Sequence, residues 1–202
     1  MTRPVIGLSG RSGAGKDTLA RILYSRHGYV RHAFADPLRD MALAIDPTVF
    51  GDFGEAWGLT EAVDIFGWDY VKQWPTVRRF LQRLGTEGVR NHLGADTWVR
   101  LTEQRIAASD APAIVLTDVR YPNEVDLVRR LGGLWVWIER PGTNAAAGHV
   151  SEEALRAEDA DVIVHNSVGV ERLEELAPGL HASALRALDR GTIATSDEGE
   201  SR

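Results

Sequence analysis

The sequence predicts an α/β fold in which a parallel sheet is flanked by helices, with a helical region and a short lid added to it. Short apolar runs of strand length alternate along the chain with segments whose apolar residues recur at the helical period. This alternation is typical of a parallel sheet covered on both faces. The composition agrees, because 44% hydrophobic and 26% charged residues over 202 positions are typical of a globular protein with a core.

The first apolar run, Val5–Ser9, leads directly into glycines and is expected to be a buried strand. The remaining strands are expected at residues 29–35, 113–117, 134–138 and 162–164. Helices are expected at residues 17–26, 38–45, 76–92, 96–108, 122–131 and 170–188. Asp36 is the expected N-cap of the second helix, and Gly132-Gly133 is expected to end the fifth. Residues 46–74 predict only short helices and loops.

The chain is expected to form one domain over residues 1–188. Within it, about residues 36–108 form the helical region. About residues 140–157 are small and polar, without an apolar face, and are expected to form the lid. Residues 189–202 are polar and rich in Gly, Ser and Thr, which predicts a flexible tail.

Charge and composition exclude several functions. A net charge of −6 provides no basic surface for a nucleic-acid backbone. No apolar run approaches the roughly 18 residues that a membrane helix needs. The absence of cysteine excludes a disulfide framework and a thiolate metal site. We therefore expect a cytoplasmic protein that binds neither nucleic acid nor membranes.

A glycine-rich segment, GRSGAGKDT from Gly10, lies between the first strand and the first helix. Glycines allow main-chain N–H groups to surround a polyphosphate, and the helix N-terminus adds partial positive charge. Lys16 would then bridge the terminal phosphates. The segment therefore predicts a phosphate-binding loop (P-loop) that binds ATP.

The hydroxyl of this loop is displaced by one residue from the common pattern. Asp17 follows the lysine, and Thr18 supplies the hydroxyl, which would reach a metal ion through water. This spacing resembles the nucleoside-monophosphate-kinase branch of P-loop enzymes more than the GTPase or motor branch. Asp17 would be either a carboxylate favoured by the helix dipole or a part of the phosphate site.

A second group of polar residues, DVRYPNE from Asp118, follows the expected strand at residues 113–117. Ligands of open parallel sheets bind beyond the carboxyl ends of the strands, so Asp118 should face the same crevice as the P-loop. Asp118 would hold Mg²⁺ through water or orient an acceptor hydroxyl, and Arg120 has the planar fork suited to phosphate. Glu124 would pair with Arg120 or with the acceptor; alternatively, it would only cap the following helix.

A helix rich in arginine is the candidate site for an acceptor phosphate. Four arginines lie on or near it, along with three other candidate residues: Arg78, Arg79, Arg83 and Arg90, with Gln82, Gly85 and Thr86. Positions 78 and 82 share a helix face, as do positions 79 and 83. Arg78 is the preferred phosphate ligand, and the alternative for any one of these arginines is a solvated surface position. Trp98 would either stack on a base or belong to the core.

Four segments together resemble the bacteriophage deoxynucleoside monophosphate kinase family, within the P-loop nucleoside and nucleotide kinases. They are GRSGAGKDT from Gly10, FADPLRD from Phe34, LQRLGTEGVR from Leu81 and DVRYPNE from Asp118. GHVSEE from Gly148, followed by ADVIVHN, is a weaker similarity. The P-loop is shared by many kinases, whereas LGTEGVR and DVRYPNE are more particular.

The resemblance implies a P-loop kinase fold, ATP with Mg²⁺ as the donor, and a deoxynucleoside monophosphate acceptor that feeds phage DNA synthesis. The residues implied to bind ATP are Gly10, Arg11, Gly13, Gly15, Lys16, Asp17 and Thr18, with Thr18 also near the metal. Those implied for the acceptor are Arg39, Arg78, Gln82, Gly85, Thr86, Trp98, Asp118, Arg120 and Glu124. The residues implied in catalysis are Lys16, Asp118, Arg120 and Arg140. Arg39 replaces a lysine of the family pattern, which keeps the charge but changes its geometry.

Other functions compete with this one. A related kinase would act on dephospho-coenzyme A or phosphomevalonate, and a non-catalytic module would only bind a nucleotide. A GTPase is excluded because Lys16 and Lys72 are the only lysines and neither belongs to an Asn-Lys-x-Asp motif. The expected partners are small nucleotides. The aromatic-rich region 46–74 is a candidate surface for a homodimer, and a phage-encoded protein would act in the host cytoplasm.

Overall fold

The structure is a computed structural model that describes residues 3–142 and 155–197, with side chains described through residue 190. The chain divides into two compact units. We call residues 1–33 together with residues 103–202 the sheet unit, and Phe34–Thr102 the helical unit. The helical unit overlaps the helical region expected at about residues 36–108.

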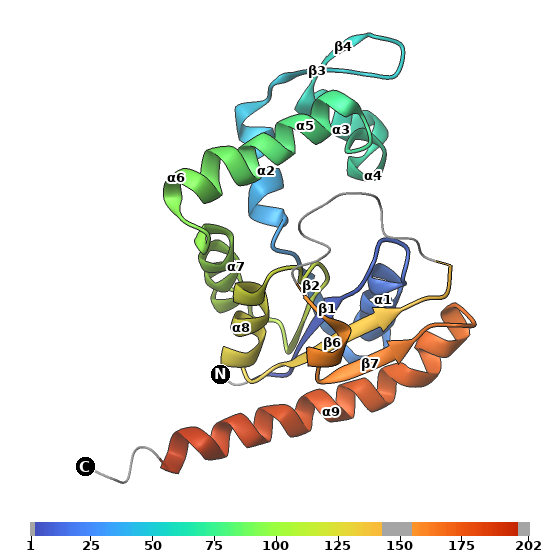
Figure 1. The fold of residues 1–202 in the computed structure, drawn as a ribbon, viewed down its shortest axis with the longest axis vertical. Helices are drawn as coiled ribbons and strands as arrows, with labels where there is room; N and C mark the ends of the chain where they lie inside the picture. The colour runs from blue at the N-terminus through green and yellow to red at the C-terminus, as the bar shows by residue number, and fades with distance from the viewer. Residues whose placement is uncertain (1–2, 143–154, 198–202) are drawn as a thin grey trace. The chain divides into compact units, whose positions relative to one another are not determined.

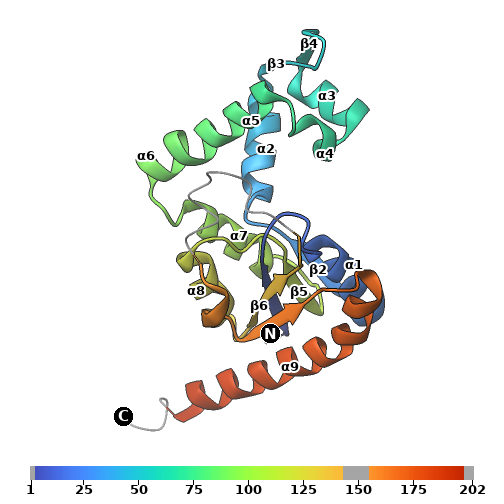
Figure 2. The same cartoon turned by 45° about the vertical axis from the view of Figure 1, so that its right-hand side comes forward.

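The sheet unit is built on five parallel strands in the order β2-β5-β1-β6-β7. Figure 1 labels β1, β2, β6 and β7, and Figure 2 labels β5. The strands are β1 (Val5–Ser9), β2 (Tyr29–His32), β5 (Ala113–Leu116), β6 (Leu134–Glu139) and β7 (Val162–His165). The central strand, β1, pairs Ile6 with Val115 on one side and with Leu134 on the other. This sheet confirms the predicted α/β fold, although β2 ends earlier than the expected residue 35.

Helices cover both faces of this sheet, as Figures 1 and 2 show. The helices are α1 (Lys16–His27), α8 (Pro122–Arg130), the short 3₁₀ helix η3 (Ala157–Asp159) and α9 (Val170–Asp197). Ile6 and Leu8 belong to a core that includes α1 and α9, which pack side by side. Gly7 faces α8 instead, because a Cβ added there would lie 2.6 Å from a methyl group of Val128.

Helix α9 continues to Asp197, past the expected end at residue 188. The tail expected from residue 189 therefore begins as helix, and residues 198–202 lie outside the described residues. Most of the expected lid, residues 143–154, including the GHVSEE segment, also lies outside them.

The helical unit has a core of its own. It contains α2 (Asp36–Ile45), β3 (Thr48–Phe50), β4 (Ala56–Gly58), α3 (Leu59–Phe66), α4 (Trp68–Val71), α5 (Pro75–Gln82), the π-helix η1 (Arg83–Arg90) and α6 (Asn91–Leu93). Helix α7 (Thr97–Ala107) runs from this unit into the sheet unit. The core of the helical unit includes four residues that are fully or nearly fully buried: Val49, Leu59, Trp74 and Val77.

Three details of the helical unit differ from the sequence predictions. Helix α2 begins at Asp36 after an N-cap at Ala35, so Asp36 lies in the first turn and is not the cap. Strands β3 and β4 form an antiparallel pair where only helices and loops were expected. The single helix expected at residues 76–92 is divided into α5, η1 and α6.

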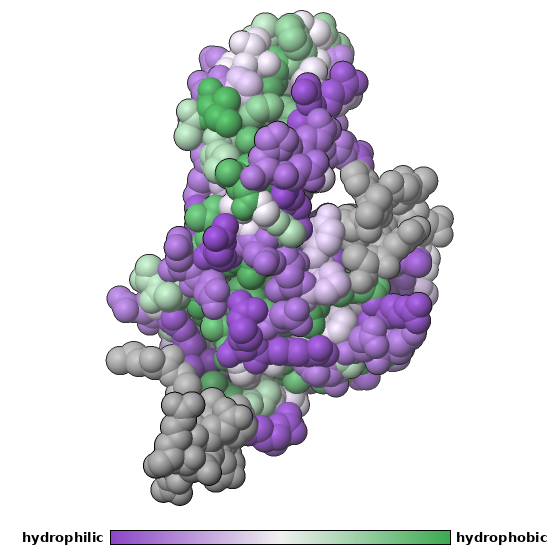
Figure 3. Space-filling view, turned by 60° about the vertical axis from the view of Figure 1, so that its left-hand side comes forward, coloured by the Kyte–Doolittle hydropathy of each residue, from purple (hydrophilic) through white to green (hydrophobic). Residues whose placement is uncertain are grey.

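Apolar side chains are exposed on the helical unit. Figure 3 shows green apolar areas among purple polar ones on one of its faces. The large exposed side chains of the helical unit as a whole include Phe50, Phe53, Ile65 and Tyr70, and Phe53 is 97% exposed. A homodimer through this region stays a prediction. In the part of the chain that the structure describes, no helix is both long and apolar enough to cross a membrane.

Candidate active site

The P-loop connects the end of β1 to the start of α1, as predicted. Its backbone needs glycine at two positions in particular. Gly10 has a backbone φ of 130° and Gly15 has one of 115°, values that residues other than glycine rarely adopt. A Cβ at Gly10 would lie 2.3 Å from the carbonyl oxygen of Ile138, and a Cβ at Gly15 would lie 2.7 Å from Nδ2 of Asn166. The loop therefore lies tightly against the ends of β6 and β7.

Lys16 folds back across this loop. Its Nζ donates hydrogen bonds to the carbonyl oxygens of Gly10 at 2.7 Å and of Arg11 at 2.9 Å. The ammonium group therefore lies over the main chain of the P-loop, where a phosphate would add oxygen acceptors. Asp17 is an exposed carboxylate in the first turn of α1, and Thr18 is half-buried.

Hydrogen bonds join the segment after β5 to the end of β1. The N–H of Val119 donates to the carbonyl oxygen of Leu8 at 3.1 Å, and Oγ of Ser9 donates to the carbonyl oxygen of Val119 at 2.8 Å. Nε1 of Trp135 donates in turn to Oγ of Ser9 at 2.8 Å. Asp118, half-buried, is thereby placed at the same edge of the sheet as the P-loop, as expected.

The sequence reasoning did not select Ser9 or Trp135 for this role. Both side chains are buried, and each completes a hydrogen bond that links strands far apart in the sequence. The sequence feature that could have indicated Ser9 is a hydroxyl residue at the end of an otherwise apolar strand. A buried polar residue at such a position needs a partner.

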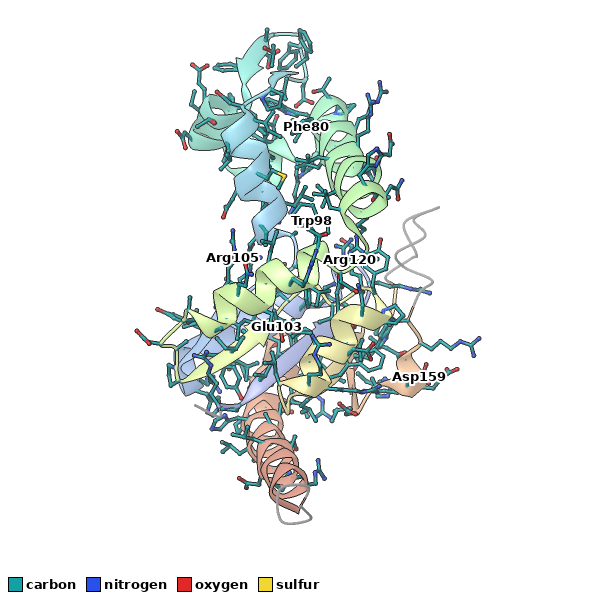
Figure 4. All side chains as sticks on the ribbon, turned by 90° about the vertical axis from the view of Figure 1, so that its left-hand side faces the viewer. Phe80, Trp98, Glu103, Arg105, Arg120 and Asp159 are labelled. Atoms are coloured by element: carbon teal, nitrogen blue, oxygen red, sulfur yellow. The ribbon has the colours of Figure 1, made fainter. Side chains whose placement is uncertain are left out.

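Glu124 is a structural residue of this segment. It is 2% exposed, and its Oε2 accepts hydrogen bonds from the main-chain N–H of Arg120 at 2.7 Å and of Tyr121 at 3.1 Å. These bonds agree with the capping alternative, in which the carboxylate holds the turn that carries Asp118 and Arg120 into α8. Contact between Glu124 and the acceptor stays a prediction. The Arg120 side chain is exposed, on the loop before α8 (Figure 4).

Asn166 is a third residue that the sequence reasoning did not select. It follows β7 and is 1% exposed. Its Nδ2 donates to the carbonyl oxygen of Ala14 in the P-loop at 2.8 Å, and its main-chain N–H donates to the carbonyl oxygen of Glu139 at 2.7 Å. Arg140 follows Glu139 and is exposed at the start of the expected lid. The signal was an asparagine directly after the apolar run VIVH.

Apart from Arg39, the predicted acceptor residues in the helical unit fall into two groups, exposed and buried. Arg78, Gln82 and Thr86 are exposed on α5 and η1. Gly85 and Trp98 are buried, and Nε1 of Trp98 donates to the carbonyl oxygen of Gly85 at 3.0 Å. Burial and this bond favour the core alternative for Trp98, in which it anchors the π-helix. Stacking of Trp98 on a base stays a prediction.

Gly85 has a packing role in the helical unit. A Cβ there would lie 3.2 Å from Cδ2 of Leu38, so glycine lets α2 approach η1 closely. Arg39 is half-buried and makes an ion pair of 3.6 Å with Asp36. Its guanidinium carbon also lies 5.8 Å from the ring centroid of Trp68. Both contacts are with residues of the helical unit.

A groove of about 680 Å³ follows another side of α5 and η1. Its lining includes Arg79, Arg83 and Phe80, and it does not include Arg78 or Gln82. The groove therefore follows the face that carries Arg79 and Arg83, and not the face of Arg78, the preferred phosphate ligand. Arg83 pairs there with Glu87 at 3.4 Å.

Perturbed titratable groups lie at the other end of α1. Burial, the adjacent His181 and Arg26 lower the pKa of His27, whose ring stacks on His181 with centroids 4.4 Å apart. Burial raises the pKa of Tyr29. A 12-residue helix separates His27 from Lys16 by about 16 Å at about 1.5 Å per residue. These shifts therefore do not act on the P-loop directly.

Comparison with known proteins identifies the family. The family model for deoxynucleotide monophosphate kinase matches residues 58–176, which is more than half of the chain. The chain belongs to this kinase family. Membership confirms the resemblance read from the four sequence segments and makes the protein a phosphotransferase that acts on deoxynucleotide monophosphates. It also implies nucleotide substrates with ATP as the donor.

Individual relatives agree with this assignment. A putative deoxynucleotide monophosphate kinase of Acanthamoeba polyphaga mimivirus is 30% identical over 186 residues, covering 83% of this chain and 90% of the relative. The deoxynucleoside-5'-monophosphate kinase of Escherichia phage T5 is 27% identical over 184 residues, covering 64% and 73%. The crystal structure of TT1252 from Thermus thermophilus is similar with a TM-score of 0.50 and 20% identity, over 91% of this chain and 98% of that one. The last similarity concerns the fold alone.

In this kinase, the sheet unit alone brings together the P-loop, Asp118, Arg120 and Arg140 at or near the carboxyl ends of its strands. Arg39, Arg78, Gln82 and Thr86 belong to the helical unit. Within residues 3–142 and 155–197, no group of three or more His, Cys, Asp or Glu residues gathers that would hold a metal ion by itself.

Proposed function

We propose that this kinase transfers the γ-phosphoryl group of ATP, with Mg²⁺, to a deoxynucleoside monophosphate and so supplies diphosphates for DNA precursor synthesis. The P-loop carries the proposal, because its glycine backbone and the position of Lys16 over it form a polyphosphate site at a helix N-terminus. The half-buried Asp118 at the same edge of the sheet supplies a polar group for the second substrate.

The P-loop would bind the phosphates of ATP through its main-chain N–H groups and Lys16. Lys16 already makes hydrogen bonds to two carbonyl oxygens of the loop, so its ammonium is held where phosphate oxygens would join these acceptors. Phosphoryl transfer needs little covalent chemistry from a protein; it depends on positioning and on neutralising charge. Gly10, Arg11, Gly13, Gly15, Lys16, Asp17 and Thr18 are the proposed ATP-binding residues.

The Mg²⁺ ion would be held together with the phosphates. Mg²⁺ usually keeps several waters and binds through one or two protein oxygens plus substrate phosphates. The half-buried hydroxyl of Thr18 and carboxylate of Asp118 are oxygen ligands of this kind, on the P-loop helix and on the adjoining strand end. When bound, the ion would neutralise charge on the phosphates.

Each unit, taken by itself, carries proposed acceptor contacts. Asp118 would orient the acceptor, and Arg120, held by the turn that Glu124 stabilises, would contact phosphate. Arg140, exposed at the end of β6, would neutralise charge on the transferred group. In the helical unit, Arg78, Gln82 and Thr86 are exposed and remain the proposed phosphate and acceptor contacts. Gly85 and Trp98 would act by shaping η1.

The competing activities are less consistent with these observations. The family match favours deoxynucleotides over dephospho-coenzyme A or phosphomevalonate, and it favours a catalyst over a module that only binds nucleotides. Relatives from a phage and a giant virus are consistent with a viral source and with action in the host cytoplasm.

A panel of acceptors tests the proposal. The enzyme is incubated with ATP and each of the deoxynucleoside monophosphates in turn, with dephospho-coenzyme A and phosphomevalonate as comparison acceptors. Product formation is followed by coupling ADP release to NADH oxidation, with each phosphorylated product identified by mass. We expect transfer to at least one deoxynucleoside monophosphate. Transfer to a comparison acceptor alone would contradict the proposal.

A further inference from the structure

Asn166 joins three parts of the sheet unit through a side chain that is almost completely buried. Nδ2 donates to the carbonyl oxygen of Ala14 at 2.8 Å, and Oδ1 accepts from the N–H of Gly169 at 3.0 Å. The main-chain N–H donates to the carbonyl oxygen of Glu139 at 2.7 Å. Since both ends of the amide have partners of the correct type, its orientation is determined by the hydrogen bonds.

The bond to Ala14 controls the direction of one peptide group in the P-loop. In a trans peptide, the C=O of a residue and the N–H of the next residue point in opposite directions. The C=O of Ala14 points to Asn166, so the N–H of Gly15 points away from the buried side of the loop. Outward main-chain N–H groups are what a P-loop uses to bind phosphate.

The packing around Gly15 shows that this peptide has little freedom to turn. A Cβ on Gly15 would lie 2.7 Å from Nδ2 of Asn166 and 3.0 Å from Cδ1 of Leu173. Ala14 and Leu173 are themselves buried. The underside of the loop therefore rests directly on the Asn166 amide and on α9.

We infer that Asn166 is a positioning residue for ATP: its buried amide orients the Ala14–Gly15 peptide so that the N–H of Gly15 faces the phosphates. The inference rests on the proposed role of the P-loop in binding ATP. The main-chain N–H of Asn166 also binds Glu139 at the end of β6, so the same residue connects the P-loop to the strand that directly precedes Arg140. A neutral amide suits this position, since a carboxylate would repel both the Ala14 carbonyl and the phosphates.

Two variants separate the donor from the rest of the side chain. Asn166→Ala removes the donor without adding charge. Asn166→Asp keeps the shape but removes the donor when it is ionised, and when protonated it regains an O–H that can donate to Ala14. A buried carboxyl holds its proton to a higher pH than an exposed one, so this recovery falls within an accessible range. Gln104→Glu, the same amide-to-carboxylate change at an exposed position of α7, is the control.

The Kd of a non-hydrolysable ATP analogue is measured by calorimetry at several pH values from about pH 8 to about pH 5. This range is chosen because the buried carboxyl of Asn166→Asp should have a raised pKa that falls within it. We expect Asn166→Ala to weaken binding about tenfold, which equals about 1.4 kcal/mol. Asn166→Asp should bind still more weakly at high pH and recover relative to wild type as the pH falls. Gln104→Glu should follow wild type, and the KM for the monophosphate should stay within about twofold in all variants.

The outcomes are distinguishable. A folded Asn166→Ala variant that binds the analogue as tightly as wild type overturns the inference, as does a lowered melting temperature with unchanged Kd. If Asn166→Asp does not fold at neutral pH, Asn166→Ala still decides the matter. Failure of the wild-type enzyme to bind the analogue at all would contradict the proposed function instead.

Discussion

Removing the carboxylate of Glu124 should destabilise the turn that carries Asp118 and Arg120. The Glu124→Ala variant leaves the two main-chain N–H groups at Arg120 and Tyr121 without the acceptor that they have at 2.7 and 3.1 Å. Arg120 is exposed and Tyr121 half-buried, so water can reach this turn, and we take about 1 kcal/mol for each bond, the lower end of the range. The total is about 2 kcal/mol.

That loss can be measured by thermal unfolding. In a chain of this size, each kcal/mol of lost stability lowers the melting temperature by about 2–4 °C. A loss of about 2 kcal/mol should therefore lower it by about 4–8 °C. Glu124→Gln keeps a neutral acceptor and should lose roughly half as much. At temperatures well below the transition, Glu124→Ala should raise the KM for the monophosphate more than the KM for ATP, because the loosened turn carries the proposed acceptor contacts.

Glu171 provides the matched control. It is also a glutamate in the first turn of a helix, but it is exposed, so Glu171→Ala should change the unfolding free energy by no more than about 0.5 kcal/mol. Equal melting temperatures for Glu124→Ala and wild type would refute the assigned capping role. So would equal losses in both alanine variants.

Three further changes test other parts of the structure. Gly10→Ala places a Cβ 2.3 Å from a carbonyl oxygen of β6 and should abolish binding of an ATP analogue. Gly54→Ala introduces a comparable strain at positive φ, 84°, but its Cβ meets nothing within 4 Å and lies outside the P-loop, so it should bind normally in the same calorimetric titration. Ser9→Ala removes a buried hydroxyl with two partners and should cost about 1–3 kcal/mol in chemical denaturation; no loss would contradict the inter-strand network. His27 has a lowered folded-state pKa, so its stabilising contribution is full above its unfolded value of 6.5 and is lost as the pH falls below it. His27→Gln should therefore flatten the decline in stability below about pH 6.5, and a decline as steep as that of wild type would count against this assignment.

The sheet and the P-loop could be predicted from the sequence because their signals are local. Apolar runs between glycines and helical segments located all five strands of the parallel sheet, and Gly10 and Gly15 have the backbone angles that only glycine tolerates well. The position of Asp118 beside the P-loop followed from the general arrangement of parallel sheets.

The features that were missed depend on contacts between distant segments. Asn166 contacts the P-loop across 152 positions of sequence, and Ser9 contacts Val119 across 110, which no local pattern reports. A period near 3.6 cannot be distinguished from that of a π-helix over the eight residues of η1. The sequence pattern around Trp98 is compatible with base stacking and with a place in the core. The hydrogen bond from Trp98 to Gly85 favours the core, and it cannot be read from the sequence pattern.

Product stoichiometry in the wild-type enzyme and in two lysine variants tests the central claim most directly. With ATP and a deoxynucleoside monophosphate, ADP and the deoxynucleoside diphosphate should appear in equal amounts when separated by chromatography. Lys16→Ala should lower kcat by about a hundredfold or more, a loss typical of removing one group that stabilises the transition state. Lys72→Ala, which removes an exposed lysine paired with Asp69, should retain wild-type turnover. ADP formed without the diphosphate, or full activity in Lys16→Ala, would contradict the account.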